Sequence, residues 1–296
     1  MLKCCVAIMA YNEEANIGRL LDALLRQRLE TVSIAEIAVV ASGCTDHTEK
    51  IVREYVALDP RVKLHIQSQR EGKSSAINLL LRQTRQEIIV LESADTLPSP
   101  DTIENLVVPF ADPNVGMTGG RPVPTNDPHQ FMGFTIHLMW NLHHRISLRR
   151  PKMGELIAFR NIFRQIPYDS AVDEASIEPL ILGQGMALRY VPEAIVYNRG
   201  PETVYDFYKQ RRRIYAGHLY VRDMLGYRVA TMSGLRILPL FLAEMRLDWR
   251  YFVWAPAAIA LEAVFRLKSL IDYSIWRSKP FIWSVSETTK ELIKSP

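Results

Sequence analysis

The stretch Ile88-Ile89-Val90-Leu91-Glu92-Ser93-Ala94-Asp95 decides the fold class of this chain. Its four apolar residues are mostly β-branched, which is typical of a strand buried on both faces of a parallel sheet. The run ends in acidic residues, and open α/β sheets bind ligands outside the carboxyl ends of their strands. A carboxylate there is well placed to hold a divalent cation against a diphosphate, because hard cations prefer oxygen ligands. An ordinary solvated acidic turn is the alternative interpretation.

Strand and helix patterns alternate along the chain on both sides of this run. Strands are expected over 4–9, 36–40, 62–66, 87–91, 115–122, 155–159 and 187–191. Helices are expected over 15–26, from Thr45 or Asp46 to about Leu58, and over 73–82, 130–148, 173–182 and 203–224. This order predicts an α/β fold with a mainly parallel, Rossmann-like sheet and helices on both faces. We expect a glycine turn, or a close approach of the backbone to a ligand, at Gly119-Gly120.

The composition is that of a globular protein. The chain has 296 residues, of which 48% are hydrophobic and 23% charged. This length favours a catalytic domain over 1–200 with a helical C-terminal region over 201–296. The formal net charge of +4 is too small to imply a nucleic-acid partner. The apolar part of the N-terminus is too short to suggest a signal peptide.

The three cysteines are expected to be reduced thiols. Cys4 and Cys5 are adjacent within a predicted strand, so their side chains lie on opposite faces and are poorly placed to bridge. Cys44 lies in a turn, and the three do not have the spacing of a metal site. A reducing compartment is therefore expected.

Polar clusters follow the first four predicted strands, which suggests one shared ligand crevice. They occupy residues 10–14, 41–46, 70–78 and 92–95. Gly72-Lys73-Ser74 superficially resembles a phosphate-binding P-loop, but that motif needs a glycine where this chain has Gln67. Lys73 at a helix N-terminus is still expected to contact a diphosphate, because backbone N–H groups and the helix dipole favour an anion there. A solvated lysine at a helix start is the alternative.

The ordered set of motifs resembles the family 2 glycosyltransferases, which have the GT-A nucleotide-sugar fold. The matching pieces cover roughly residues 2–217 and are 8–14, 39–46, 72–78, 93–95, Gly154, Arg160, Asp173-Glu174 and 210–214. Each piece is short, and it is their order that makes the set specific. The resemblance implies a metal-dependent hexosyltransferase that uses a nucleoside-diphosphate sugar.

The resemblance also implies which residues contact the donor. They are Ala10, Tyr11, Glu13, Ser42, Arg70, Lys73, Ser93, Ala94, Gln210 and Arg213. Among these, Ala10, Tyr11 and Glu13 would line the base and ribose, and Arg70 and Lys73 would face the base or the diphosphate.

The acidic residues receive separate roles from the resemblance. Asp95 matches the last acid of the family's Asp-x-Asp signature and would hold Mg²⁺ or Mn²⁺ between diphosphate oxygens. Glu174 would be the catalytic base, with Asp173 as the close second, and direct attack would invert the anomeric carbon. The alternative for this pair is a helix N-terminus, where the dipole favours acidic residues.

Four residues, at three places in the chain, depart from the family pattern. Ser93 stands where the family has the first acid of Asp-x-Asp, and Ala41-Ser42 stand where it has aspartates near the base. Ile214 replaces the tryptophan of the Gln-x-x-Arg-Trp element that Gln210 and Arg213 otherwise match, which weakens the case for processive synthesis.

Two further function classes follow from these departures and from the fold. A degenerate, non-catalytic member that binds a nucleotide sugar stays an alternative. A sugar-phosphate nucleotidyltransferase would have a glycine-rich loop after the first strand, and residues 10–13 contain no glycine.

The C-terminal third is apolar and helical in pattern. Its apolar run at 252–261 falls well short of the ~20 residues that span a bilayer. Glu262 and Arg266 have the spacing of an i,i+4 pair. The aromatic residues resemble an interfacial belt and are Trp249, Tyr251, Trp254, Tyr273, Trp276 and Trp283.

These features predict a peripheral or monotopic protein on the cytoplasmic side of the cell membrane, with a lipid-linked or saccharide acceptor. A helical subdomain that packs on the catalytic core is the alternative. His137, His143 and His144 are expected to serve packing or acceptor contacts rather than a metal.

Overall fold

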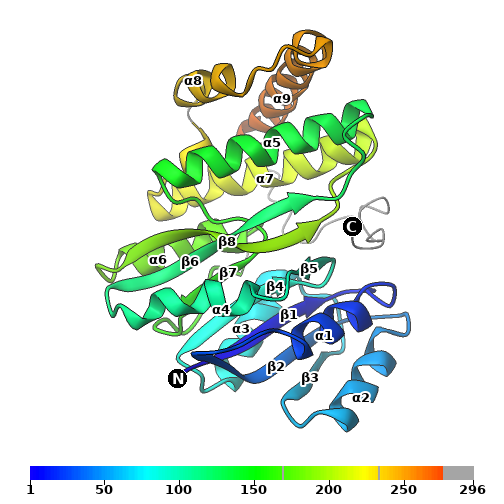
Figure 1. The fold of residues 1–296 in the computed structure, drawn as a ribbon, viewed down its shortest axis with the longest axis vertical. Coiled ribbons are helices and arrows are strands. Elements are labelled where there is room, and N and C mark those ends of the chain that lie inside the picture. Colours follow the sequence, from blue (N-terminus) through cyan, green and yellow to red (C-terminus); the bar gives the residue numbers. More distant parts are fainter. Residues whose placement is uncertain (169, 233, 276–296) are drawn as a thin grey trace.

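The computed structural model describes residues 1–168, 170–232 and 234–275. Within these residues, an eight-stranded sheet forms the body of the structure, in the order β3-β2-β1-β4-β7-β6-β8-β5. Helices flank the sheet, and a second layer of helices lies over the half of the molecule that contains β6 and β8 (Figure 1).

The N-terminal half of the sheet is the predicted α/β alternation. Strands β1 (Leu2–Ala10), β2 (Val32–Ser42), β3 (Val62–Gln67) and β4 (Ile88–Ser93) pair in parallel. They alternate with helices α1 (Ile17–Leu25), α2 (Thr48–Leu58) and α3 (Lys73–Gln83). The predicted element types are confirmed here, with bounds that shift by a few residues.

Both faces of this half-sheet are buried, which explains its continuous apolar runs. Cys4, Val6 and Ile8 belong to the core under α1 and α2, whereas Cys5 and Ala7 belong to the core under α3. The adjacent cysteines therefore point to opposite faces, and all three cysteines are free thiols.

The other half of the sheet corrects the prediction of a mainly parallel sheet. Strands β7 (Ile157–Arg160), β6 (Val115–Pro124), β8 (Ala187–Asn198) and β5 (Thr96–Pro98) complete it. The pairs β4–β7, β7–β6 and β8–β5 are antiparallel, and only β6–β8 is parallel. The sheet is thus mixed, because a short apolar strand such as β7 carries no mark of its direction in its sequence.

The glycine pair at 119–120 corrects a second prediction. Both residues lie inside β6 rather than in a turn, and neither lines the cavity described below. A Cβ atom on Gly119 would stand 2.5 Å from the Met153 sulfur, and one on Gly120 would stand 2.7 Å from the Ala194 carbonyl oxygen. The glycines therefore allow close packing of β6 rather than contact with a sugar.

The remaining helices are α4 (Thr102–Val107), α5 (Phe131–Arg149), α6 (Asp173–Leu182), α7 (Val204–Leu225), α8 (Gly234–Glu244) and α9 (Trp249–Ile275), with 3₁₀ turns at Val108–Ala111 and Ala230–Met232. In Figure 1, helices α5 and α7 lie above β6 and β8, and α8 and α9 lie beyond them. Helix α9 packs on α7 and α5, and α8 packs on α5. Apolar contacts join these layers, for example Ile136 of α5 with Phe207 of α7 and Phe265 of α9.

The C-terminal helices α8 and α9 therefore pack on the rest of the molecule through α5 and α7. Among the described residues, no helix combines the length and the apolar character needed to cross a bilayer. Within the predicted aromatic belt, Trp249 is exposed, whereas Trp254 packs against Phe131 and Phe134. Trp276 and Trp283 lie outside the described residues. The division at residue 200 stays a prediction.

Candidate active site

One cavity of about 710 Å³ opens at the carboxyl ends of β1, β2 and β4 and extends between α5, α7, α8 and α9. All the predicted site residues line it: Ala10, Tyr11, Glu13, Ser42, Arg70, Lys73, Ser93, Ala94, Asp95, Asp173, Glu174, Gln210 and Arg213. The structure thus brings the strand-end motifs and the downstream motifs to one place, as the crevice argument requires.

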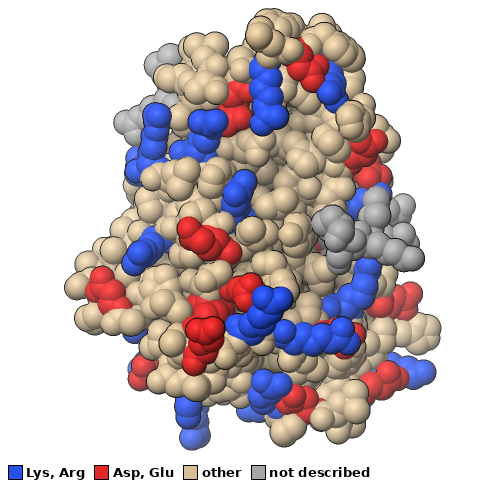
Figure 2. Space-filling model, in the orientation of Figure 1, with Lys and Arg blue, Asp and Glu red and all other residues tan. Residues whose placement is uncertain are grey.

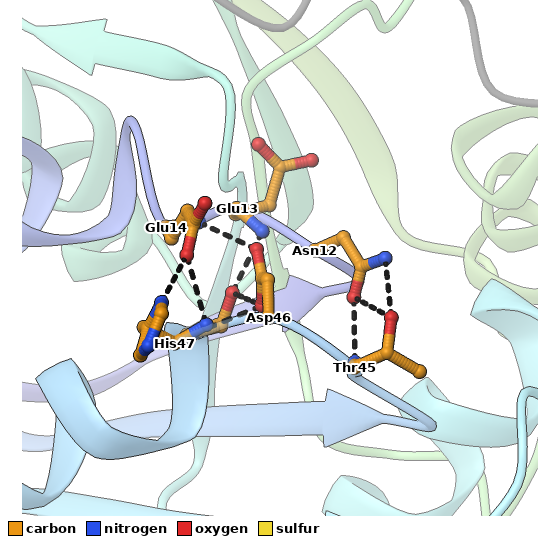
Figure 3. A network of polar contacts seen from close by, with 7 residues as sticks. Asn12, Glu13, Glu14, Thr45, Asp46 and His47 are labelled. Atoms are coloured by element: carbon orange, nitrogen blue, oxygen red, sulfur yellow. Dashed lines mark hydrogen bonds and ion pairs between the residues drawn. The ribbon is translucent and has the colours of Figure 1, made fainter.

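The turn after β1 is held firmly against the start of α2 (Figure 3). Asn12 accepts a hydrogen bond from the Thr45 backbone N–H at 2.8 Å, and Glu14 contacts the His47 ring at 2.8 Å. The Glu13 carboxylate points away from these contacts (Figure 3), and it accepts a hydrogen bond from Asn16 at 3.1 Å. These contacts hold the turn in place, with Tyr11 and Glu13 lining the cavity.

Tyr11 and Arg70 form the outer wall of this end of the cavity. The Arg70 guanidinium lies 4.0 Å from the centre of the Tyr11 ring. Such a cation–π pair fixes a flat surface with a positive edge, which suits a nucleotide base or a phosphate.

Lys73 and Asp173 join two elements across the cavity. Lys73 is the first residue of α3, where Gly72 has φ +93°, and its Nζ lies 3.0 Å from the Asp173 carboxylate at the start of α6. Burial opposes the charge, yet the nearby carboxylates of Asp173 and Glu174 raise the pKa of Lys73 above its usual value. A persistent positive charge thus lies at a helix N-terminus inside the cavity.

Glu174 is the carboxylate best suited to take a proton. Burial first, and then the negative charge of Asp173, raise the pKa of Glu174 well above its usual range. A carboxylate whose pKa is shifted toward neutral pH is a better general base than an ordinary one. Asp173 is committed to Lys73, so the arrangement favours Glu174 for this role.

Asp95 lies half-buried in the turn after β4, next to two other acids. Burial and then the charge of Asp95 raise the pKa of Glu155, and burial raises the pKa of Glu92 to about 8. Among the described residues, no group of three or more His, Cys, Asp and Glu side chains forms a complete metal cage. Asp95 with diphosphate oxygens is, however, the kind of donor set that Mg²⁺ takes. The residues therefore fit a cation shared with the donor.

Three cavity residues were missed by sequence reasoning. Glu155 follows Gly154 directly, Lys152 is nearly fully buried, and His218 lies on α7. An acid placed just before the apolar run 156–159 was the available signal for Glu155. No sequence pattern marks Lys152 or His218, since their role depends on which helix face meets the cavity.

The α7 motif is anchored by α9. Glu262 accepts hydrogen bonds from Arg211 at 2.6 and 2.7 Å and from Arg266 at 2.7 Å. Burial opposes ionisation, but the two arginines lower the pKa of Glu262 to about 2. The predicted Glu262–Arg266 pair is thus confirmed, and it holds the helix that carries Gln210 and Arg213.

The histidines of α5 are engaged in packing and hydrogen bonds, as expected. His143 is buried against Trp140, with ring centres 5.1 Å apart. His144 Nδ1 lies 2.9 Å from the Tyr190 hydroxyl, and His137 Nε2 lies 2.9 Å from the Asn126 carbonyl oxygen.

The chain belongs to glycosyl transferase family 2. The model of that family matches residues 5–172, which is more than half of the chain. The model of glycosyl transferase family group 2 matches residues 173–282. This result confirms the resemblance carried by the ordered motifs.

Two curated relatives are similar over most of this chain. A poly-β-1,6-N-acetyl-D-glucosamine synthase of Staphylococcus aureus (strain COL) is 22% identical over 83% of this chain and 62% of its own length. An N-acetylglucosaminyltransferase of Sinorhizobium fredii is 23% identical over 79% of this chain and 59% of its own length. The chain thus spans only about six tenths of the length of these relatives.

Solved structures share the fold. A mannosyltransferase of Pyrobaculum calidifontis in complex with GDP-Man and Mn²⁺ has a TM-score of 0.66 and 22% identity, covering 93% of this chain and 88% of its own. Glucosyl-3-phosphoglycerate synthase of Mycobacterium tuberculosis, with Mn²⁺, UDP and phosphoglyceric acid, has a TM-score of 0.53 and 18% identity, covering 74% and 78%. The mixed sheet is therefore that of the GT-A glycosyltransferases.

Proposed function

We propose that this chain is a metal-dependent, inverting glycosyltransferase that moves a sugar from a nucleoside-diphosphate sugar to an acceptor hydroxyl. One observation supports this most strongly: Asp95, Glu174 and Lys73 line the same cavity, and Lys73 pairs with Asp173, the neighbour of Glu174. The solved relatives that hold GDP-Man or UDP with Mn²⁺ add support from a shared fold.

The donor end of the cavity holds and neutralises the diphosphate. Lys73 and Arg213 offer positive charge to the phosphate oxygens, and Tyr11 with Arg70 offers a flat surface to the base. Bound at Asp95, Mg²⁺ or Mn²⁺ supplies further neutralisation of the leaving nucleoside diphosphate.

The transfer itself is a single displacement. The acceptor oxygen attacks the anomeric carbon while the bond from that carbon to the diphosphate breaks, and Glu174 takes the hydroxyl proton. Asp173 stays paired with Lys73 and keeps it in place. One attack from the face opposite the leaving group inverts the anomeric carbon.

A location at the cytoplasmic face of the cell membrane is also proposed. Helix α9 exposes large apolar side chains, among them Phe252, Leu267 and Ile271. Several exposed large apolar side chains on one helix are typical of membrane or protein contacts. The acceptor in this setting is lipid-linked or a saccharide.

A non-catalytic donor-binding protein is the second candidate. The observation that favours it is Ser93, which removes one carboxylate from the donor end of the cavity. The two candidates differ in turnover, not in donor binding.

The experiment combines binding with turnover. Calorimetry of the full chain with a panel of UDP- and GDP-sugars, each with Mg²⁺ or Mn²⁺, identifies the donor. We expect Glu174→Gln to bind that donor normally and to lose roughly 10²- to 10⁴-fold in the rate of sugar-nucleotide hydrolysis. Asp95→Ala should abolish the Mn²⁺ dependence of hydrolysis.

Glu193→Gln, a change of an exposed acid outside the cavity, serves as the matched control and should behave as the wild type. An unchanged turnover number in Glu174→Gln would remove Glu174 from the base role. Donor binding with no hydrolysis by the wild type under any metal would favour the non-catalytic candidate.

A further inference from the structure

Ser93 leaves the end of β4 with one carboxylate fewer than the family pattern has there. Asp95 is then the one predicted metal ligand of the chain. Mg²⁺ at such sites is held by one or two carboxylates together with substrate phosphates. A second carboxylate that faces Asp95 from another element would therefore restore the charge that Ser93 removes.

The register between β4 and β7 indicates where such a carboxylate lies. The two strands are antiparallel, and their last printed pair is Leu91 opposite Ile157, the first residue of β7. Continued by two residues beyond the start of β7, this register puts Glu155 opposite Ser93. Residues directly opposite in an antiparallel pair point to the same face of the sheet and are close enough to interact.

The alternation of side chains along both strands places Glu155 on the cavity face. Leu91 and Ile157 belong to the core under α3. Ser93 and Glu155 lie two residues further along their strands, so they share that face, and both line the cavity. Glu92 is directed to the opposite face, where it is fully buried and does not line the cavity.

The charges that act on Glu155 are those of the donor end of the cavity. Burial and then the charge of Asp95 raise the pKa of Glu155, whereas Lys73 and Arg213 act to lower it. Among the described residues, no direct hydrogen bond or ion pair engages the Glu155 carboxylate, so its oxygens can bind a ligand. Neighbouring carboxylates disfavour each other's ionisation, and a divalent cation between them removes that cost.

We propose that Glu155 is a second ligand of the divalent cation, so that this chain carries one acid of its metal site before β7 instead of at the end of β4. This inference rests on the proposed function and adds a residue to its metal site. Asp95 and Glu155 share the cation, and diphosphate oxygens and water complete its ligands. Ser93 then gives no reason to regard the protein as non-catalytic, because the neighbouring strand supplies the charge that it removes.

Metal binding tests the proposal separately from turnover. Calorimetry of the full chain measures Mn²⁺ binding in the presence of UDP and, in a second series, of GDP. With the nucleotide that supports Mn²⁺ binding, we expect Glu155→Gln to raise the Kd for Mn²⁺ by roughly tenfold or more, because one charged ligand is lost. An unchanged Kd for Mn²⁺ in this variant would overturn the proposal.

Returning the acid to β4 gives the sharpest comparison. The double change Ser93→Asp with Glu155→Gln keeps the number of carboxylates and should recover most of the lost Mn²⁺ affinity. Glu92→Gln is the matched control, because Glu92 is next to Ser93 in the sequence but lies outside the cavity. It should bind Mn²⁺ as the wild type does. A double variant as weak as Glu155→Gln, or an equal loss of affinity in Glu92→Gln, would overturn the proposal.

Carboxylate labelling of the wild-type protein keeps the test decisive if a variant folds poorly. A water-soluble carbodiimide couples glycine ethyl ester to accessible carboxylates, and mass spectrometry identifies the labelled positions. Mn²⁺ added to the nucleotide-bound protein should protect Asp95 and Glu155 together and leave the exposed Glu193 labelled. Protection of Asp95 without Glu155 would overturn the proposal.

The two proposals fail in different ways. A wild type that binds no Mn²⁺ with either nucleotide would overturn the metal-dependent function, and the role of Glu155 with it. A wild type that binds Mn²⁺ equally well with or without the Glu155 carboxylate would overturn the role of Glu155 alone and leave the proposed function standing.

Discussion

Glu92 is a carboxyl group whose ionisation conflicts with its buried surroundings. It is fully buried, one of its oxygens accepts a hydrogen bond from the Thr96 hydroxyl, and the other has no partner among the described residues. Burial raises the pKa of Glu92 to about 8, so the protonated form is favoured in the folded protein. A neutral Glu92 does not compete with Asp95 for a cation.

This raised pKa predicts a pH-dependent stability. The unfolded chain releases the proton near the ordinary glutamate pKa of 4.5, whereas the folded chain keeps it up to a pKa of about 8. The stabilisation is therefore complete below pH 4.5 and is lost as pH rises toward 8. Glu92→Gln, which does not titrate, should raise Tm by several degrees at pH 8 and change it little at pH 4.5, at about 2–4 °C per kcal/mol.

Thermal unfolding of both proteins across this pH range measures the difference. Glu193→Gln, at an exposed position, is the control and should give no pH-dependent difference. An equal change of Tm at pH 4.5 and pH 8 would contradict the assigned titration.

At this scale the sequence predicted more of the site than its short motifs suggest. Asp95 and Glu174 are 79 residues apart in the sequence, yet both line one cavity. Asp95 follows the end of β4 and Glu174 lies at the start of α6, and both belong to the motifs that the sequence predicted. Glu155 and His218 were not predicted, because a single acid before a strand and a single histidine on a helix have no pattern that distinguishes them from surface residues.

At the scale of elements, the contact between α7 and α9 controls the position of Gln210 and Arg213. Glu262 joins Arg211 of α7 to Arg266 of α9, and its side chain is only 21% exposed. Removing one partner of a buried ionic group leaves the others uncompensated and costs about 3–5 kcal/mol. We therefore expect Glu262→Gln to lower the free energy of unfolding by about 3 kcal/mol at pH 7 and to weaken donor binding.

The pH dependence of this effect has a defined sign. The pKa of Glu262 is lowered to about 2 in the folded protein, so its stabilisation is present above the unfolded value of 4.5 and is lost as pH falls toward 2. Urea unfolding at pH 7 and pH 3 should show a difference between wild type and Glu262→Gln that shrinks at pH 3.

Asp272→Asn is the matched control for this clamp. Asp272 pairs with Arg212 of α7 at 2.7 Å, with side chains 25% and 39% exposed, so this pair is worth less than about 1 kcal/mol. If the two variants lose the same stability at pH 7, the Glu262 group does not have the role assigned to it.

Element type was easier to predict than element direction. Periodicity identified β4, α6 and α7 to within a few residues, because buried faces impose it on the sequence. The antiparallel entry of β7 between β4 and β6 depends on long-range pairing, and a four-residue apolar strand fits either direction. The sequence predicts a turn or a close approach to a ligand at Gly119 and Gly120, because only the packed structure shows Met153 and Ala194 against them.

At the scale of the whole molecule, charge and apolar surface are distributed differently. Lys, Arg, Asp and Glu side chains are interspersed over much of the face shown in Figure 2, so no broad surface of a single sign forms there. The large exposed apolar side chains are instead numerous on α8 and α9, which form one end of the long axis in Figure 1. This asymmetry gives the molecule an apolar end, formed by α8 and α9.

The apolar end leads to the last prediction, binding to lipid vesicles. The full chain should float with neutral phosphatidylcholine liposomes, and binding should persist in 1 M salt, because apolar burial is not screened as surface charge is. Leu267 and Leu270 of α9 are 60% and 38% exposed, and each buried leucine contributes about 1.5–3 kcal/mol. The double change Leu267→Gln with Leu270→Gln should therefore reduce the bound fraction at least tenfold, since about 1.4 kcal/mol corresponds to a tenfold change. Val56→Gln with Leu58→Gln on α2, also exposed, is the control and should float as the wild type does. Recovery of the wild type wholly in the soluble fraction at low and high salt would show that α9 serves another contact.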